Sequence, residues 1–256
     1  MHFNLPEVSV IIPTRSRPQL LRRAVGSVWG QDYPGFITCI IVFDQCEPVP
    51  PEVTPYSNRR LLCVVNTRSL GPAGARNTGV TVAEGEFVAF LDDDDEWLPQ
   101  KLSRQVNLLT TNSRADFTWT GIELITPKRK IVRQATHKNN LYRALLKSRL
   151  MEINSSTLLV RRAFLCERIG LIDEQIPGSY GEDYDWLLRA ARNGQGLPIP
   201  EPLARIYWNR PSYFAQNWDT ICSAIEYLLR KHPDFYSEPK GLARLYGQLA
   251  FAHAAA

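Results

Sequence analysis

The sequence predicts an α/β fold in which helices flank a mostly parallel sheet. Apolar, strand-like runs alternate with helical patterns over the first half of the chain. These runs are continuously apolar, which indicates strands that are buried on both faces of a sheet. The chain has 256 residues, of which 44% are hydrophobic and 22% charged, so it can form a complete core.

Four strands and two helices are expected in the first half. The expected strands are residues 8–12, 37–43, 61–65 and 86–91. Ser16 is the predicted cap of the first helix, with Pro18 in its first turn and apolar residues at helical spacing up to Val28. The second helix is expected from Gly71 to about Ala83.

The second half shows a more mixed pattern. A helix is expected after Pro99, followed by a strand over residues 116–125 and an extended segment over residues 151–161. Another helix begins at Glu182, and its first turn is acidic, which the helix dipole favours. From Ser212 onward the chain is predicted to be helical and partly amphipathic.

Carboxylates follow two of the predicted strands. Asp44 ends the second strand, and Asp92, Asp93, Asp94 and Asp95 directly follow the fourth. In parallel sheets ligands bind outside the carboxyl ends of the strands, so both groups can line one crevice. Four adjacent like charges repel one another unless a cation offsets them, and a hard divalent metal with oxygen ligands would do so.

Six short motifs occur in a fixed order between about residues 7 and 210. They read VSVIIPTR (8–15), LLRRAVGSV (20–28), GARNTG (74–79), FLDDDDEWLPQKL (90–102), GLIDE (170–174) and EDYDW (182–186). In this order the chain resembles the family 2 glycosyltransferases, which are nucleotide-sugar-dependent enzymes of the GT-A fold. The resemblance implies a Rossmann-like sheet with a C-terminal acceptor-binding part and a helical tail.

The resemblance also implies a division of the chain. Residues 1–120 would form the nucleotide-sugar-binding half, residues 121–210 the acceptor-binding half of the same domain, and residues 211–256 a helical extension. The Gln-x-x-Arg-Trp motif of processive members is absent from the sequence, which favours a single-addition enzyme.

Several residues are implied in binding the nucleotide. Pro13, Thr14 and Arg15 would lie at the nucleotide edge after the first strand, and Asp44 would accept a hydrogen bond from the base. Where the family often has two acids, this chain reads Asp44-Gln45-Cys46-Glu47, a departure that bears on the base contact. Arg76 either contacts phosphate or braces its own helix, and the sequence leaves both interpretations open.

The resemblance implies a metal site and a catalytic base. Asp92 and Asp94 match the outer residues of the DxD motif, with Asp94 the first candidate for direct ligation of Mg²⁺ or Mn²⁺. Asp93 would lie near the ribose or a metal-bound water. Asp183 matches the base that takes the proton of the acceptor hydroxyl. Neighbouring Glu182 would raise the pKa of Asp183 and the helix dipole would lower it.

The predicted function is metal-assisted, inverting transfer of a sugar from a nucleotide-diphosphate sugar to a hydroxyl acceptor. The acceptor would be a sugar, a lipid-linked glycan or another hydroxyl compound in glycan, polysaccharide or glycoconjugate biosynthesis. Two alternatives remain at this point: a sugar nucleotidyltransferase, and a non-catalytic nucleotide-sugar-binding protein of the same fold.

Charge and cysteine content narrow the partners and the location. The net charge of +4 is too small to indicate nucleic acid as a partner. Five scattered cysteines support neither a disulfide framework nor a zinc site. The basic stretch, residues 128–149, contains no acid and is predicted to be a solvated face, an acceptor-docking surface or a peripheral membrane contact. With neither a signal peptide nor a membrane span in the sequence, a cytoplasmic location is expected.

Overall fold

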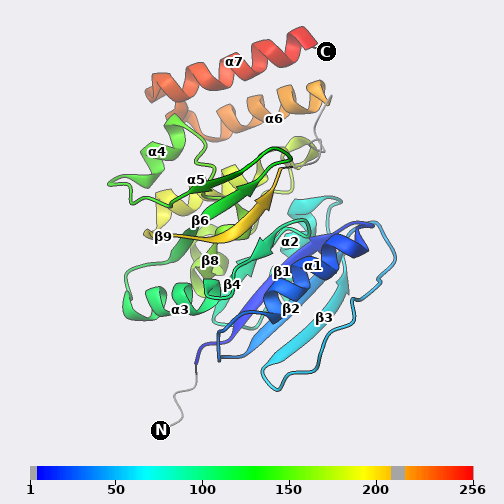
Figure 1. The fold of residues 1–256 in the computed structure, drawn as a ribbon. Helices are drawn as coiled ribbons and strands as arrows, with labels where there is room; N and C mark the ends of the chain where they lie inside the picture. The colour runs from blue at the N-terminus through cyan, green and yellow to red at the C-terminus, as the bar shows by residue number, and fades with distance from the viewer. Residues whose placement is uncertain (1–4, 209–216, 256) are drawn as a thin grey trace.

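The computed structural model describes residues 5–208 and 217–255 (Figure 1). Its centre is a nine-stranded sheet with the strand order β3-β2-β1-β4-β8-β6-β9-β5, and β7 pairs with β6 at the side of this path. The first four strands lie at one end of the molecule, and the two C-terminal helices lie at the other (Figure 1).

The first half confirms the predicted parallel strands. They are β1 (Val8–Thr14), β2 (Ile37–Phe43), β3 (Arg59–Val65) and β4 (Phe87–Phe90). Each pairs in parallel with its neighbour, in the order β3-β2-β1-β4. The predicted helices are α1 (Pro18–Trp29), which connects β1 to β2, and α2 (Pro72–Val82), which connects β3 to β4. Residues 44–58 connect β2 to β3 without a helix.

The second half of the sheet is mixed. Its strands are β5 (Glu96–Trp97), β6 (Phe117–Ile125), β7 (Lys130–Arg133), β8 (Leu159–Arg161) and β9 (Gly196–Tyr207). β8 pairs antiparallel with β4 and with β6, whereas β9 runs parallel to β6 and antiparallel to β5. The predicted α/β fold is confirmed, with its parallel pairing concentrated in the first half.

Helices and short helical turns complete the second half. They are α3 (Lys101–Thr111), α4 (Leu141–Lys147), η1 (Ser155–Thr157), the π-helical η2 (Phe164–Ile169), η3 (Pro177–Ser179), α5 (Glu182–Asn193), α6 (Trp218–Lys231), η4 (Pro233–Ser237) and α7 (Pro239–Ala255). The segment 151–161, which was expected to be extended, contains the turn η1 before β8. The expected helical start at Ser212 lies outside the described residues.

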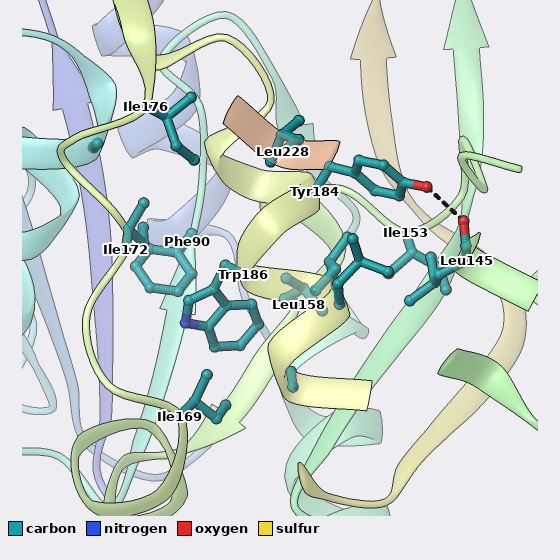
Figure 2. Close-up of a cluster of buried hydrophobic side chains, with 14 of the residues drawn as sticks. Phe90, Leu145, Ile153, Leu158, Ile169, Ile172, Ile176, Tyr184, Trp186 and Leu228 are labelled. Carbon is teal, nitrogen blue, oxygen red and sulfur yellow. Dashed lines mark hydrogen bonds between the residues drawn. The ribbon is translucent and has the colours of Figure 1, made fainter. Parts of the chain in front are cut away.

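The two faces of the sheet carry two separate apolar cores. Val10 and Ile12 of β1 belong to the core that also contains residues of α1 and α3, while Ile11 belongs to the core that contains residues of α2, α5 and α6. Figure 2 shows part of the second core, where the ring of Trp186 meets Phe90 edge-on with 6.4 Å between centroids. Trp186 therefore fixes α5 against the end of β4, as a buried core residue.

Candidate active site

The four aspartates after β4 divide into two inward and two outward side chains. Asp93 and Asp95 are buried. The side chains of Asp92 and Asp94 are 36% and 34% exposed. The segment turns back on itself, since the backbone N–H of Asp95 donates to the carbonyl of Asp92 over 3.0 Å. Burial thus alternates along the turn, and the side chains of Asp92 and Asp94 are the ones exposed enough to meet a ligand.

The inward pair holds the turn in place. Asp93 accepts hydrogen bonds from Thr14 Oγ1 at 2.7 Å and from Arg17 Nε at 3.0 Å. Burial raises the pKa of Asp93 to about 6, although Arg17 and Thr14 act in the opposite direction. Asp95 accepts from Ser156 Oγ at 2.6 Å, which ties the turn to the second half of the sheet.

Arg17 reaches the acid turn because of an unusual backbone conformation before α1. Ser16 has a φ of +53°, in the left-handed region, and Arg17 occupies the N-cap position without a side-chain capping bond. The prediction that Ser16 caps the helix is therefore wrong. The turn at Ser16 instead directs Arg17 towards Asp93 and Asp94, and non-glycine residues in this conformation cluster at functional sites.

The outward pair has the chemistry of a partial metal site. Asp92 Oδ1 lies 2.6 Å from Arg76 Nη2, and Asp94 Oδ2 lies 3.1 Å from Arg17 Nη1. Within the described ranges no three histidine, cysteine or carboxylate side chains form a complete metal-binding group. Two partly exposed carboxylates fit Mg²⁺ or Mn²⁺ all the same, because such ions are commonly held by one or two carboxylates plus substrate phosphates.

Arg76 connects this turn to the acidic start of α5. One end of its guanidinium lies 2.6 Å from Asp92, and the other end lies 2.6 Å from Glu182 Oε1. Burial would lower the pKa of Arg76, but Asp92 and Glu182 raise it above its ordinary value. The bracing interpretation of Arg76 agrees with these contacts, and its contact with phosphate remains a prediction. The two acidic motifs, 90 residues apart in sequence, thus share one cation.

Glu182 and Asp183 have opposite environments although they are neighbours. Burial, together with the charge of Asp183, raises the pKa of Glu182 to about 7 against the effect of Arg76. Asp183 is also largely buried, which would raise its pKa, but Arg149 and Arg76 hold the pKa below the ordinary value. Arg149 Nη2 donates to both carboxylate oxygens of Asp183, at 2.7 and 2.5 Å. This ion pair, which the sequence did not indicate, outweighs the charge of Glu182.

The nucleotide edge is brought together at the ends of β1 and β2. Asp44 is buried, and its oxygens accept from Asn66 Nδ2 at 2.8 Å and from the Gly71 N–H at 3.0 Å. Its predicted contact with the base therefore competes with bonds that shape the loop before α2. The hydroxyl of Thr14 donates a hydrogen bond to Asp93, whereas the side chain of Arg15 is exposed at the nucleotide edge. These assignments to the nucleotide, including that of Pro13, remain predictions.

Three cations of the basic stretch pair with acids elsewhere in the fold. Lys130 pairs with Glu123 at 2.9 Å, Arg143 pairs with Glu238 at 3.1 Å, and Arg149 pairs with Asp183. These residues lie on β7, on α4 and in the loop after α4. Among residues 5–208 and 217–255, no helix has the length and apolar character needed to cross a membrane.

Comparison with known proteins decides the family. The model of the family described as "Glycosyl transferase family 2" matches residues 9–170, which is more than half of the chain. The chain belongs to glycosyl transferase family 2. The matched region contains β1, Asp44, Arg76 and the Asp92–Asp95 turn. The resemblance inferred from the ordered motifs is thereby confirmed.

Several curated relatives of this family 2 chain act on lipid-linked sugars or carry polysaccharide names. It is 29% identical over 141 residues to the Escherichia coli UDP-Glc:alpha-D-GlcNAc-diphosphoundecaprenol beta-1,3-glucosyltransferase WfgD, a match covering 55% of each chain. It is 36% identical over 104 residues to the putative colanic acid biosynthesis glycosyl transferase WcaA of E. coli strain K12, covering 39% of this chain and 37% of that protein. The chain thus spans about half the length of these relatives or less.

Solved structures share the fold. The structure of S. aureus TarS residues 1–349 with UDP-GlcNAc has a TM-score of 0.63 at 19% identity, covering 87% of this chain and 66% of that one. A mannosyltransferase from Pyrobaculum calidifontis, in complex with GDP-Man and Mn²⁺, also has a TM-score of 0.63, at 20% identity, covering 98% and 74%. These likenesses confirm the predicted GT-A fold class.

Proposed function

We propose that this family 2 chain is an inverting glycosyltransferase that moves a sugar from a nucleotide-diphosphate sugar to an acceptor hydroxyl. The observation that supports this is the bridge made by Arg76, which brings Asp92 and Glu182 to within 2.6 Å of one guanidinium. The proposed metal-binding turn and the start of α5, which carries the proposed base, are thereby linked through one cation, as a shared site at the carboxyl end of the sheet would require.

Asp92 and Asp94 would hold Mg²⁺ or Mn²⁺ at this crevice, together with the phosphates of the donor. When bound, the ion would stabilise the negative charge of the leaving diphosphate. The Mn²⁺ complex of the Pyrobaculum mannosyltransferase supports this proposal. Asp93 is fully buried against Thr14 and Arg17, so its predicted contact with ribose or a metal-bound water would require Arg17 to move.

Asp183 would take the proton of the acceptor hydroxyl as that oxygen attacks the anomeric carbon. The attack comes from the face opposite the leaving diphosphate, so a single displacement inverts the anomeric configuration. Residues 1–120 would bind the donor, residues 121–210 the acceptor, and the helical extension would cover the acceptor side. The start of α5 suits this role because Trp186 packs it firmly against the end of β4.

The names of the relatives suggest the acceptor class. WfgD is named for a sugar linked to diphosphoundecaprenol, and WcaA is named for an extracellular polysaccharide. We propose by analogy that this chain adds one sugar to a lipid-linked acceptor in polysaccharide or glycoconjugate biosynthesis. Such an acceptor would bring the protein to a membrane surface, where exposed lysines and arginines of the basic stretch would assist. Family membership lends no support to the sugar nucleotidyltransferase alternative.

A donor screen combined with one substitution tests the proposal. We expect one nucleotide sugar in a panel to raise the Tm in a Mn²⁺-dependent way and to support transfer. Asp183→Asn should bind this donor within about twofold of wild type yet lose about 10²- to 10⁴-fold in turnover, the range ascribed to a general base. Asp219→Asn is the matched control, because Asp219 is an exposed acid in the first turn of α6.

Near-wild-type transfer by Asp183→Asn would show that the base lies elsewhere. Donor binding without any turnover by wild type would instead favour a non-catalytic binding protein. Hydrolysed donor without a glycosylated product would indicate that the acceptor is wrong, because water then replaces it.

A further inference from the structure

The proposed base is already occupied by a cation in this structure. Arg149 Nη2 contacts both oxygens of Asp183, at 2.7 and 2.5 Å. A carboxylate in such an ion pair accepts a proton less readily, because protonation forfeits the attraction of the guanidinium. Catalysis by Asp183 therefore requires something to draw Arg149 away.

Arg149 is placed to meet an anion from solvent. Its side chain is 47% exposed, and it contacts Asp183 through Nη2 alone. In the part of the chain that the structure describes, its Nε and Nη1 make no hydrogen bond. These two donors can each meet an anion, and once Nη2 leaves Asp183 it can pair with either of them in bidentate binding of phosphate.

A second arginine lies on the same aromatic ring. The guanidinium carbon of Arg149 lies 5.9 Å from the ring centroid of Tyr184, and that of Arg244 lies 5.6 Å from the same centroid. Arg244 Nη2 also donates to the Tyr184 hydroxyl over 3.0 Å. That hydroxyl donates in turn to the Leu145 carbonyl, which fixes the ring (Figure 2). Two cations thus flank one rigid ring beside Asp183.

An aromatic hollow adjoins this pair. Arg244 lines a cavity of about 340 Å³ between α6 and α7, and the other walls include Trp218 and Phe251. The rings of these two residues meet edge-on, with 5.5 Å between centroids. A pair of cations next to an aromatic hollow suits a ligand that has an anionic group joined to an apolar part.

We propose that Arg149 is the phosphate-binding group of the acceptor site and, through the same contact, a lock on Asp183. The phosphate of a phosphate-linked acceptor takes the guanidinium and leaves the carboxylate free. This inference rests on the proposed function, in which Asp183 is the base. The acceptor hydroxyl then gives its proton to Asp183, its oxygen bonds to the anomeric carbon, and the bond to the donor diphosphate breaks with the electron pair leaving on that diphosphate.

The charges around Asp183 favour this exchange. The diphosphate of such an acceptor carries two negative charges, against one on a carboxylate, and each phosphorus offers two non-bridging oxygens, so it competes well for Arg149. Glu182 and Arg76 remain beside Asp183 throughout, because Arg76 is buried between Glu182 and Asp92. The lock would also limit the wasteful transfer of sugar to water, since the base is released only when a charged acceptor has arrived.

The test uses the full chain and two probes that differ in charge. One is N-acetylglucosamine joined through a diphosphate to a short alkyl chain, and the other is the uncharged alkyl glycoside of the same sugar. Wild type should bind the diphosphate probe at least tenfold more tightly than the uncharged one. Arg149→Gln should abolish this difference, and Arg149→Lys should keep part of it. Arg230→Gln, which changes an exposed arginine of α6 outside the basic stretch, is the matched control and should behave as wild type.

Turnover separates a lock from a merely structural arginine. In Arg149→Gln we expect KM for the diphosphate acceptor to rise at least tenfold, while transfer to the uncharged acceptor and to water equals or exceeds that of wild type. A structural role would lower transfer to both acceptors alike, and that outcome would overturn the proposal. Equal binding of the two probes by wild type would also overturn it.

Two further outcomes distinguish a failure of this inference from a failure of the proposed function on which it rests. If affinity for UDP, or for the nucleotide found in the donor screen, falls with Arg149→Gln as much as affinity for the diphosphate probe, the arginine serves the donor and the proposal is wrong. If wild type shows no turnover with any nucleotide sugar, the proposed function fails, and the binding comparison still decides whether Arg149 recognises phosphate.

Discussion

The two acidic motifs of this chain, the turn after β4 and the start of α5, reduce the repulsion between neighbouring carboxylates in different ways. After β4, adjacent aspartates alternate between inside and outside, so that Asp93 and Asp95 are buried while Asp92 and Asp94 are partly exposed. At the start of α5 the acids instead pair with different cations: Glu182 with Arg76, Asp183 with Arg149, and Asp185 with Arg189 and Lys231. The ring of His232 also contacts Asp185.

This difference teaches that neighbouring acids of one motif have separate roles, which the local backbone geometry assigns. In the turn after β4, the inward acids act as structural acceptors and leave the outward acids for a ligand. In the helix, successive side chains project in directions about 100° apart, so three acids reach three different partners. The predictions below test this division between structural and chemical carboxylates, beginning with the largest expected effect.

Asp94→Ala should abolish most metal-dependent nucleotide binding. Because the charge of the metal is worth several kcal/mol in holding a diphosphate, we expect the affinity in Mn²⁺ to fall about 100-fold or more. The free energy of unfolding should change little, since Asp94 is partly exposed. Isothermal calorimetry with and without Mn²⁺ measures the first effect, and unchanged affinity would remove Asp94 from the metal site.

Asp95→Ala should have the opposite effect: it should lower the free energy of unfolding rather than act mainly on metal-dependent nucleotide binding. Asp95 is buried and accepts from Ser156 Oγ at 2.6 Å and from the Tyr207 N–H at 3.2 Å. Its loss leaves a buried hydroxyl and a partly buried N–H without this acceptor, at a cost of about 2–3 kcal/mol in the free energy of unfolding. Urea denaturation measures this cost with Asp94→Ala as the matched control, and equal stability of the two variants would contradict the division of the turn.

Much of the fold could be predicted from the sequence, because regular strands and helices produce regular patterns of apolar residues. Continuous apolar runs predicted the parallel strands of the first half, and the ordered motifs identified the family. The roles of Asp92, Asp94 and Asp183 remain predictions. The short antiparallel strands were harder to predict. β8 has only 3 residues, and its place between β4 and β6 depends on long-range pairing that no local pattern encodes.

Two cations of the site, Arg17 and Arg149, could not be predicted from the sequence for a different reason. Arg17 follows Ser16, whose backbone is in the left-handed region, and a serine gives no reason to predict that conformation. Arg149 lies in a stretch of eight lysines and arginines that are chemically alike, and only the packing of α4 against α5 selects it. The one available signal was the absence of acids from that stretch, which implies that its partners lie elsewhere in the chain.

The third acid of α5, Asp185, should make the free energy of unfolding depend on pH. Burial would raise the pKa of Asp185, but His232, Arg189 and Lys231 lower it from 3.8 to about 2. A depressed pKa stabilises the fold above the unfolded-state value, and this contribution is lost as the pH falls from about 4 to about 2. Asp185→Asn should therefore be less stable than wild type by about 2 kcal/mol near neutral pH, since each pKa unit corresponds to about 1.4 kcal/mol.

Urea denaturation at several pH values measures this difference. The gap between wild type and Asp185→Asn should narrow steadily below pH ~4, where the wild-type carboxyl begins to take up its proton. Asp219→Asn is again the control, because its exposed carboxylate should give a small and nearly constant difference. A gap of constant size for Asp185 would mean that shape rather than charge holds this side chain.

The smallest effect concerns the link between the two motifs. Arg76 is buried and pairs with both Asp92 and Glu182, so removing one partner increases its dependence on the other. In a double-mutant cycle, Asp92→Asn with Glu182→Gln should be about 1 kcal/mol less stable than the sum of the single variants. The pKa of Glu182 is about 7, so its charge, and with it this coupling, should be larger at pH 8 than at pH 5. Additive losses at both pH values would mean that the two motifs are independent, and Arg76 would then be an ordinary buried cation.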